Sequence, residues 1–441
     1  MFGTDGVRGV ANRELTPELA LAIGRALGAR LPGGSRVMIG RDTRRSGPML
    51  EGALASGLAS AGVDAVVLGV LPTPAVAELV AWSDAAAGAV ISASHNPFPD
   101  NGIKLFGADG FKLADAEEAA VEAGLADEGE RPQADALGMI EGWDGGRQRY
   151  VESLLERRPV DLGGLTIAVD CAHGATSVTA PEVLGGLGAR LTVVGADPDG
   201  VNINDGCGST DLSLLAETVR ATRADLGLAF DGDGDRVLAV DASGTPVDGD
   251  QILAICALDA HARGVLAGDA VVTTTMTNLG FRRAMAGAGI EVRWTDVGDR
   301  YVLEEMRRGG YVLGGEQSGH LINLAHGPSG DGLAAALQLL AALAARGEDL
   351  ATAAAVMERL PQRLVSVRVR QKSDLPTADA VREAVRECER TLGEDGRVVV
   401  RASGTEPLVR VMVEAPTAAE CDRWCQAIVE AVESDLGGPL P

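Results

Sequence analysis

Three stretches of the chain share one pattern of hydrophobic and polar positions. In each stretch, a short apolar run leads into a polar loop, then into a helical segment that ends at Gly, and then into a second apolar run. Gly just past a helix end is the usual left-handed cap, and strands that alternate with helices are typical of α/β units with a partly parallel sheet. The apolar runs lie at 37–39 and 65–68, at 167–169 and 191–194, and at 271–272 and 292–294. The repetition predicts three related α/β domains with mixed sheets.

The last segment of the chain follows a different pattern. It predicts a strand at 364–369, a helix at 378–392, two strands flanking 401–407, and a final helix from about 418 to 432. This order predicts a smaller C-terminal α+β domain rather than a fourth repeat. We expect boundaries near Gln148, Asp248 and Pro361, which divide the chain into 1–148, 149–248, 249–360 and 361–441.

Length and composition agree with this division. At roughly 100 to 200 residues per domain, the 441 residues predict two to four domains. Hydrophobic residues make up 46% and charged residues 23%, as in an ordinary globular protein. The formal charge of -24 repels polyanions, so nucleic acid is not an expected partner, and any anionic substrate needs a local basic pocket.

The cysteines and the N-terminal sequence bear on the compartment. Six cysteines are scattered without a C-x-x-C pair, which favours reduced, buried thiols over a zinc or redox site. The first residues lack a basic and apolar leader, and no stretch is apolar and long enough to span a bilayer. We therefore expect a cytoplasmic protein with no membrane partner.

The clearest chemical signal is an acidic loop after the apolar run 226–230. Asp231, Asp233 and Asp235 alternate with glycines, so an extended segment would present all three carboxylates on one side. Three hard oxygen ligands on one loop suit Mg²⁺. The alternative is a solvated acidic turn, which like charges this close disfavour unless a cation lies among them. A calcium-binding EF-hand is excluded because Arg236 and Ala242 occupy the positions where that motif needs Gly and Glu.

A second signal is the segment 91–97, which follows the apolar run 89–91. Asn96 and Pro97 favour a tight turn that leaves the hydroxyl of Ser94 exposed at the end of a strand, where α/β folds place their sites. By itself the segment is also typical of a Ser that only makes local hydrogen bonds.

Two further loops carry polar side chains suited to a sugar phosphate. In 401–407, a guanidinium, two hydroxyls and a Gly-flanked run of amides form a pattern that favours phosphate binding, although a polar hairpin turn is the alternative. Its residues are Arg401, Ser403, Gly404 and Thr405, with Arg410 on the next strand. In 314–320, which we expect to follow a strand at 311–313, Glu316 and Ser318 alternate on one side and suit hydrogen bonds to sugar hydroxyls. A lone His or Glu in such a loop is more often structural.

These four loops lie one in each expected domain, and together with the segment 2–9 they resemble the α-D-phosphohexomutases across the whole chain. The resemblance implies three α/β domains and a smaller fourth domain around a central cleft. It also implies that Ser94 is phosphorylated and that a Mg²⁺ ion lies between its phosphate and Asp231, Asp233 and Asp235, with Ser94 among the ligands. The substrate phosphate would bind to the 401–405 loop and Arg410, and the ring hydroxyls to Glu316 and Ser318.

The resemblance also points to residues for proton transfer. These are Lys104, His320 and Arg8, which the sequence does not rank. Because a guanidinium is a poor proton acceptor, Arg8 is better suited to steering a phosphate than to accepting a proton.

Within the family, Gln317 and the segment 202–210 resemble the branch that acts on glucosamine phosphates. This implies interconversion of glucosamine 6-phosphate and glucosamine 1-phosphate, with glucosamine 1,6-bisphosphate as intermediate and activator, in the supply of amino-sugar nucleotides and cell-wall precursors. The alternative is a phosphomannomutase or phosphoglucomutase that uses the same residues. A sugar-phosphate sensor is disfavoured, because it has no use for a phosphorylatable Ser94 beside a metal site. A homodimer is left open.

Overall fold

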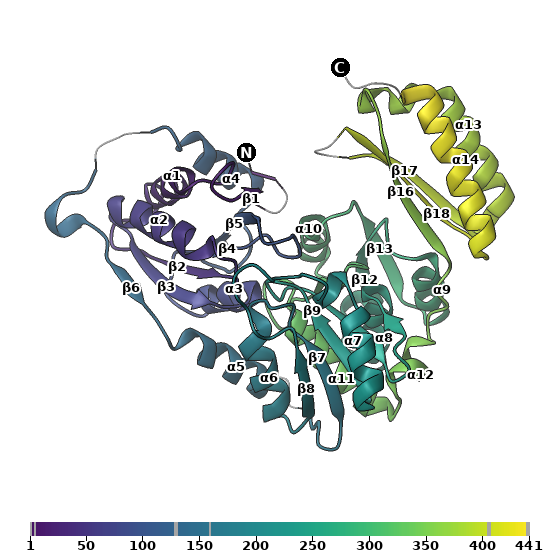
Figure 1. Ribbon diagram of the computed structural model, residues 1–441, viewed down its shortest axis with the longest axis horizontal. Helices are drawn as coiled ribbons and strands as arrows, with labels where there is room; N and C mark the ends of the chain where they lie inside the picture. Colours follow the sequence, from purple (N-terminus) through teal and green to yellow (C-terminus); the bar gives the residue numbers. More distant parts are fainter. Residues whose placement is uncertain (1, 4–5, 128–130, 158–159, 404–406, 438–441) are drawn as a thin grey trace. The chain divides into compact units, whose positions relative to one another are not determined.

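The computed structural model describes residues 2–3, 6–127, 131–157, 160–403 and 407–437. The chain forms two compact units, one of Met1–Thr274 with Arg293–Ala355 and the other of Thr275–Val292 with Val356–Pro441. Within the described ranges, the strands form four sheets, of six, five, four and three strands (Figure 1).

The first α/β domain contains a mixed sheet in the order β1-β5-β4-β2-β3-β6. Its strands are β1 (Val7–Val10), β2 (Arg36–Arg41), β3 (Asp64–Val70), β4 (Ala87–Ile91), β5 (Asp100–Gly107) and β6 (Ile140–Gly142). Its helical segments are α1 (Pro17–Gly28), α2 (Gly47–Ser60), α3 (Thr73–Ala81), α4 (Asp115–Ala123) and the 3-10 turn η1 (Ala134–Ala136). β2 pairs in parallel with β3 and β4, whereas β5 runs antiparallel to both β1 and β4.

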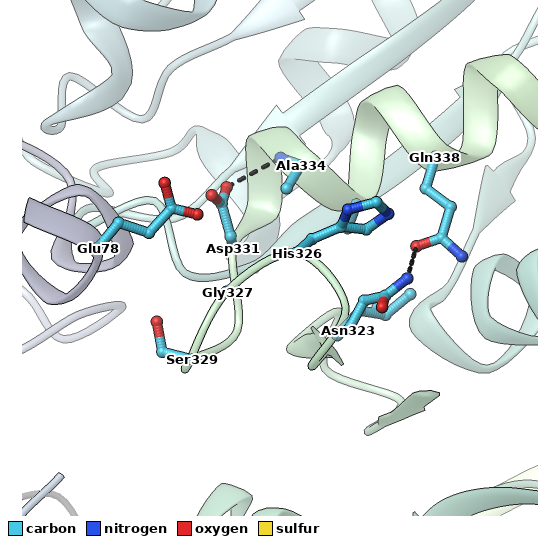
Figure 2. A pocket seen from close by; sticks show the side chains of 10 residues that line it. Glu78, Asn323, His326, Gly327, Ser329, Asp331, Ala334 and Gln338 are labelled. Atoms are coloured by element: carbon cyan, nitrogen blue, oxygen red, sulfur yellow. Dashed lines mark hydrogen bonds between the residues drawn. The ribbon is translucent and has the colours of Figure 1, made fainter. Parts of the chain in front are cut away.

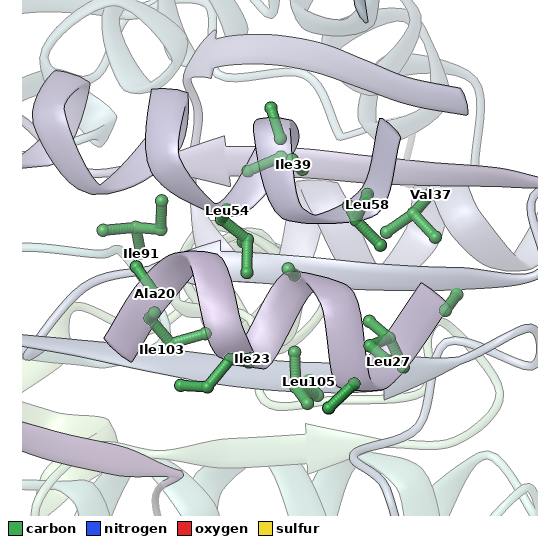
Figure 3. Close-up of a cluster of buried hydrophobic side chains, with 14 of the residues drawn as sticks. Ala20, Ile23, Leu27, Val37, Ile39, Leu54, Leu58, Ile91, Ile103 and Leu105 are labelled. Atoms are coloured by element: carbon green, nitrogen blue, oxygen red, sulfur yellow. The ribbon is translucent and has the colours of Figure 1, made fainter. Parts of the chain in front are cut away.

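The core of this domain lies between the sheet and the helices α1 and α2. Apolar residues three or four positions apart on α1, such as Ile23 and Leu27, pack with Leu54 and Leu58 of α2 (Figure 3). The two helices approach so closely that a Cβ added at Gly24 would lie 2.2 Å from the carbonyl oxygen of Leu54. Truncating a buried leucine here to alanine would cost about 2–5 kcal/mol.

The second α/β domain contains a sheet in the order β11-β10-β9-β7-β8. Its strands are β7 (Thr166–Asp170), β8 (Arg190–Val194), β9 (Leu226–Phe230), β10 (Val237–Asp241) and β11 (Pro246–Val247). Its helical segments are α5 (Gly146–Arg157), α6 (Thr176–Gly186), α7 (Ser213–Thr222) and the 3-10 turn η2 (Gly208–Thr210). β9 is buried along its whole length at the centre of the sheet, so the acidic loop starts from a rigid strand.

The third sheet has the order β13-β12-β14-β15. Its strands are β12 (Ala270–Thr274), β13 (Glu291–Thr295), β14 (Leu313–Gly315) and β15 (Leu321–Asn323). The helical segments are α8 (Gly249–Ala262), α9 (Leu279–Gly287), α10 (Asp299–Gly309), α11 (Gly332–Arg346), α12 (Leu350–Ala354) and the 3-10 turn η3 (Ala267–Asp269). The expected strand at 311–313 is wrong, because β14 begins only at Leu313 and pairs with β12 through Gly314 and Gly315.

The second unit contains an antiparallel sheet in the order β16-β18-β17. Its strands are β16 (Gln362–Arg368), β17 (Arg397–Ala402) and β18 (Leu408–Glu414), and its helical segments are α13 (Asp379–Leu392), α14 (Ala418–Leu436), η4 (Lys372–Thr377) and η5 (Gly393–Asp395). Val409, Val411 and Val413 alternate along β18 and pack with Cys388 and Ile428 from the two helices. α9 falls in this unit as well.

The structure confirms the expected fold class. Three sheets combine parallel and antiparallel pairs with helices, and the last sheet is antiparallel. Gly62, Gly188 and Gly289, just past their helices, have positive φ as expected of left-handed caps. All six cysteines are free and buried. Within the described part of the chain, no helix combines the length and the apolar character needed to cross a membrane.

Candidate active site

The acidic loop after β9 brings its three aspartates together. Carboxylate oxygens of Asp231, Asp233 and Asp235 lie within 4.8 Å of one another, and all three residues are buried. The expectation of an extended segment is wrong, because residues 232–235 form turns and bends in which Gly234 has a φ of 73°. The carboxylates converge because the chain curls around them, and glycine makes that curl available without strain.

Ser94 follows β4 and faces this loop. Its hydroxyl donates to Oδ2 of Asp231 at 2.6 Å, although the two residues belong to different domains. The expected exposure of the hydroxyl is wrong, since Ser94 is only 1% exposed. Its φ of 52° is unusual for a residue with a side chain and is typical of strain kept at a functional position.

Two residues of the first domain hold Asp233. Nζ of Lys104, on β5, lies 2.8 Å from Oδ2 of Asp233 and 3.4 Å from Oδ2 of Asp235. Thr73, at the start of α3, donates its hydroxyl to the same Oδ2 of Asp233 at 2.7 Å and its backbone N–H to the carbonyl of Asp233. Lys104 was expected from the resemblance, and Thr73 was not.

The three carboxyls are all buried, but their different neighbours shift their pKa values in different directions. Burial and the neighbouring carboxylates raise the pKa of Asp231 well above its usual value. Burial also acts to raise the pKa of Asp233, but the Lys104 ammonium and the Thr73 hydroxyl outweigh it, so the pKa is lowered. For Asp235, Lys104 and His320 overcome burial and hold the pKa well below the usual range.

The donor set fits a divalent cation. Oδ1 of Asp233 and Oδ1 of Asp235 are buried without a hydrogen bond among the described residues, although Oδ1 of Asp235 has Arg236 and His320 as ion-pair neighbours at 3.7 and 3.6 Å. A buried acceptor without a partner is costly, and an ion bound by hard oxygen ligands would remove that cost. Asp231, Asp233 and Asp235, with the oxygen of Ser94 beside them, are therefore the residues that could hold a metal.

His320 connects the acidic loop to the third domain. Its Nδ1 lies 3.6 Å from Oδ1 of Asp235, and its Nε2 lies 3.7 Å from Oδ2 of Asp299. Burial acts to lower the pKa of His320, but the carboxylates of Asp235, Asp299 and Glu316 outweigh it and raise the pKa. The imidazole is therefore disposed to carry a proton.

The loop between β14 and β15 presents the expected sugar-binding pair. Glu316 is largely buried, accepts the N–H of Gly298 at 3.1 Å, and has a pKa raised mainly by burial. The hydroxyl of Ser318 is buried and has no hydrogen-bond partner among the described residues, so it is available to a ligand. The side chain of Gln317 instead lies beside Asp248, with its Nε2 at 3.5 Å from Oδ2 of that residue.

Arg8 also belongs to this part of the molecule. It lies on β1 opposite Gly102, two positions from Lys104 on β5. Burial, together with the positive charges of Arg236 and Arg8, lowers the pKa of His95 to about 4. Arg8 is thus close enough for its charge to act on residues 92–100, the segment from the end of β4 to the first residue of β5, which we call the Ser94 loop.

The expected phosphate-binding loop lies in the second unit. Arg401 and Arg410 face each other across the antiparallel pair of β17 and β18, an arrangement of like charges that an anion would stabilise. Ser403 is buried, and its carbonyl accepts Nζ of Lys372 at 2.7 Å. Gly404 and Thr405, also expected here, lie outside the described residues.

A small cavity lies beside the start of α11, the helix that contacts the acidic loop. Its volume is about 10 Å³, enough for one water, and Glu78, Asn323 and His326 are among its lining residues (Figure 2). Asp331, also at this cavity, caps α11 and accepts the hydroxyl of Tyr150 at 3.1 Å. The next residue, Gly332, donates its N–H to the carbonyl of Gly234, so α11 buttresses the acidic loop.

Family models match the chain from residue 1 to residue 431. They are Phosphoglucomutase/phosphomannomutase, alpha/beta/alpha domain I (1–132), alpha/beta/alpha domain II (148–244), alpha/beta/alpha domain III (248–360) and C-terminal domain (364–431). These matches cover most of the chain and confirm the resemblance expected from the four loops.

Individual relatives agree with the family models. The chain is 52% identical to the phosphoglucosamine mutase of Mycolicibacterium paratuberculosis over 439 residues, which cover 98% of this chain and 99% of the relative. It is also 52% identical to a phosphoglucosamine mutase of Bacillus cereus, with 99% of each chain covered. Among solved structures, a phosphoglucomutase/phosphomannomutase family protein of Burkholderia thailandensis is 26% identical and has a TM-score of 0.83, with 99% of this chain and 100% of the other covered.

Proposed function

The chain belongs to the phosphoglucomutase/phosphomannomutase family of α-D-phosphohexomutases, and on that premise we propose that it interconverts glucosamine 6-phosphate and glucosamine 1-phosphate. It is an isomerase that transfers a phosphoryl group within its substrate. The observation that supports this most directly is the contact of the Ser94 hydroxyl with Asp231 inside a buried group of carboxylates. The near full-length identity to phosphoglucosamine mutases supports the choice of substrate.

In the proposed reaction, phospho-Ser94 gives its phosphoryl group to O1 of glucosamine 6-phosphate. The bond from phosphorus to Oγ breaks as the bond to O1 forms, and the O1 proton leaves to a base. The resulting 1,6-bisphosphate turns around, and Oγ of Ser94 takes the phosphoryl group back from O6, which recovers a proton. The strand β4 and the loop around Ser94 hold the nucleophile in place for both transfers.

Asp231, Asp233, Asp235 and Ser94 would hold Mg²⁺, which neutralises charge on a transferring phosphoryl group when it is bound. The Lys104 ammonium supplies a positive charge 2.8 Å from Oδ2 of Asp233.

Lys104 and His320 are the proposed proton-transfer residues. Each has a nitrogen within 4 Å of an aspartate of the acidic loop. His320, with a raised pKa between two carboxylates, suits the acid that returns a proton to the leaving oxygen. Arg8 is proposed to steer the phosphate, since a guanidinium is suited to binding phosphate oxygens.

Recognition of the sugar phosphate is proposed to use two loops. Arg401, Ser403, Gly404 and Thr405, with Arg410, would bind the phosphate that is not reacting. The buried Ser318 hydroxyl and the Glu316 carboxylate would bind ring hydroxyls. The boundaries at 148, 248 and 360, a homodimer and a cytoplasmic location stay predictions.

Side-by-side kinetics test the proposed substrate. We expect kcat/KM for glucosamine phosphate to exceed that for glucose or mannose phosphate by at least about tenfold, or roughly 1.4 kcal/mol of transition-state binding. The substrate ammonium would lie in a site rich in carboxylates, whereas a hydroxyl gains less there. Each assay contains Mg²⁺ and the matching 1,6-bisphosphate. Equal or better efficiency on glucose or mannose phosphate would transfer the proposal to those sugars and leave the family assignment unchanged.

A further inference from the structure

Arg44 is a fully buried arginine just after β2 that the proposed reaction does not use. Both it and its ion-pair partner Asp42 have no solvent exposure, and Nε of Arg44 donates to Oδ2 of Asp42 at 2.8 Å. The backbone N–H of Arg44 donates to the other oxygen of the same carboxylate at 2.9 Å. The charge of the guanidinium is therefore balanced locally, within the first domain.

The remaining donors of this guanidinium reach only backbone carbonyls of the Ser94 loop. Nη2 donates to the carbonyls of Ser94 and Asn96, at 2.9 and 2.8 Å. Nη1 donates to the carbonyls of Pro97 and Asp100, the latter at 3.1 Å. Together with the bond to Asp42, every N–H of the guanidinium is used. One planar group thus fixes the spacing of four carbonyls in the loop.

Asp42 also reaches the other side of Ser94. Its Oδ2 accepts the hydroxyl of Ser92 at 2.6 Å, and that hydroxyl accepts the N–H of Ser94 at 2.9 Å. The N–H of Ser94 is therefore held through Ser92, and its carbonyl is held by Arg44. Asn204 of the second domain adds a bond to the same carbonyl at 2.9 Å. These contacts keep Ser94 at its φ of 52°, which the residue would not adopt alone.

A purely structural role would not require this arrangement. Burying an ion pair often contributes little net stability compared with apolar residues of the same size, so a buried arginine is weak evidence for a contribution to folding. What the guanidinium provides is geometry, because its donors form a rigid fork that a flexible ammonium cannot replace.

We propose that Arg44 is a positioning residue for phosphoryl transfer, acting by fixing the backbone of the Ser94 loop so that Oγ of Ser94 faces Asp231. The proposal rests on the proposed function for its kinetic consequence. Its structural consequence, a fixed loop, does not depend on which reaction the protein catalyses.

The test compares full-length Arg44→Lys with wild type and with Arg41→Lys. Arg41, three residues earlier, donates its Nε to Glu51 at 3.2 Å and its Nη1 to the carbonyl of Asp42 at 3.3 Å. Among the described residues its side chain makes no hydrogen bond to residues 92–100, so it is a control for loss of a guanidinium next to the same network. A misplacement of about 1 Å costs about a hundredfold in rate, so we expect kcat of Arg44→Lys to fall at least about tenfold. We expect KM to stay within about threefold, because other loops bind the substrate. Arg41→Lys should keep kcat within about twofold of wild type.

Hydrogen exchange of the backbone amides at 92–101 provides a readout that needs no substrate. In Arg44→Lys these amides should exchange at least about tenfold faster than in wild type, while amides of α1 and β9 are unchanged. If Arg44→Lys does not fold, Ser92→Ala is the second variant, since it removes only the bridge between Asp42 and the N–H of Ser94. It should show the same two changes to a smaller extent.

The outcomes separate this proposal from the proposed function. A wild-type protein inactive on all three hexose phosphates would overturn the proposed function, and exchange at 92–101 would still decide whether Arg44 holds the loop. Unchanged exchange in Arg44→Lys would overturn the proposal. So would a KM that rises while kcat equals that of Arg41→Lys, because Arg44 would then affect substrate binding rather than the nucleophile.

Discussion

Two arginines, one in each compact unit, use the same chemistry for different ends. Arg44 in the first unit combines a buried carboxylate, Asp42, with backbone carbonyls of the Ser94 loop. Arg397 in the second unit combines a buried carboxylate, Glu414, directly opposite it on β18, with the backbone carbonyls of Thr275 and Thr277. In both cases the guanidinium binds one carboxylate and, with its remaining N–H groups, holds several backbone carbonyls at fixed positions.

The difference lies in which backbone is held. The carbonyls bound by Arg44 surround the proposed nucleophile, so an error there changes the geometry of the reaction. The carbonyls bound by Arg397 belong to the segment that enters α9, and Glu414 also accepts the N–H of Leu279, the first residue of α9, at 2.9 Å. Arg397 therefore ties residues 275–292 to the rest of the second unit. We expect errors at Arg44 to appear in turnover and errors at Arg397 to appear in stability.

The largest effect should come from removing the group that Arg44 positions. Ser94→Ala should lose more than about ten-thousandfold in kcat, because loss of a group that carries the phosphoryl costs more than loss of an acid or base. Substrate affinity, measured by calorimetry, should be unchanged, since other loops bind the sugar phosphate. Intact mass after incubation with glucosamine 1,6-bisphosphate should show an added phosphoryl group on wild type only. Substantial turnover in Ser94→Ala would move the nucleophile elsewhere, with Ser92 as the first residue to examine.

The second-largest loss of activity should come from removing the metal. Chelator-treated protein should be inactive and should recover with Mg²⁺, because the buried carboxylates of the acidic loop otherwise repel the substrate phosphate. Asp233→Asn, which removes one of three charges, should raise the Mg²⁺ concentration for half-maximal activity by at least about tenfold. An enzyme that keeps full activity without metal would refute the metal assignment.

The sequence predicted the fold class well because its signals are local, whereas the domain boundaries stay predictions. Hydrophobic runs and glycines past helix ends recur within short windows, and Gly62, Gly188 and Gly289 have the predicted backbone conformation. It failed where tertiary pairing decides, as in the strand that includes Gly314 and Gly315 and in the curled acidic loop.

The residues of the candidate site were likewise predicted only in part. The pairing of Ser94 with Asp231 came from the family resemblance and not from spacing, because the residues are 137 positions apart. The supporting residues Thr73, Arg44 and Asn204 were missed, since each acts through contacts with residues at least 50 positions away. The local signals were the polar loop after the apolar run 37–39 and the asparagines of the segment 202–210, and neither identifies a contact partner.

A moderate effect is expected from the second arginine. Arg397→Lys should lower the free energy of opening of the second unit by about 1–3 kcal/mol, because a lysine leaves buried carbonyls without donors. The cysteines provide the measurement. All six thiols are buried, and burial raises the pKa of Cys388 and Cys421 to about 11 and that of Cys171 to about 12, so the reagent reaches a reactive thiolate only when the surrounding structure opens.

Mass spectrometry should then separate the two units. In Arg397→Lys, Cys388, Cys421 and Cys425 should be alkylated roughly five- to hundredfold faster than in wild type. Cys171, Cys207 and Cys256 in the first unit should react at their wild-type rates. Arg386→Lys on the exposed face of α13, where the guanidinium pairs with Glu383 at 3.7 Å, is the control and should change neither group. Equal acceleration of all six cysteines would contradict a role confined to the second unit.

The smallest effect should come from Tyr150, which supports the acidic loop through a hydroxyl rather than through a charged side chain. Tyr150 donates its hydroxyl to Asp331, which caps α11, and the N–H of Gly332 in turn holds the carbonyl of Gly234 in the acidic loop. Tyr150→Phe keeps the ring in its buried place and removes one hydrogen bond to a carboxylate, worth about 1.5–3 kcal/mol at most. Because two further contacts separate Tyr150 from the carboxylates of the acidic loop, only part of this loss should reach them. We expect the Mg²⁺ concentration for half-maximal activity to rise about two- to fivefold, with kcat at saturating Mg²⁺ unchanged.

Tyr301→Phe, at a residue that is 40% exposed, is the matched control. If the two variants have the same Mg²⁺ dependence, α11 does not transmit its position to the acidic loop, and the other contacts of that loop, such as those of Thr73 and Lys104, are enough to hold it.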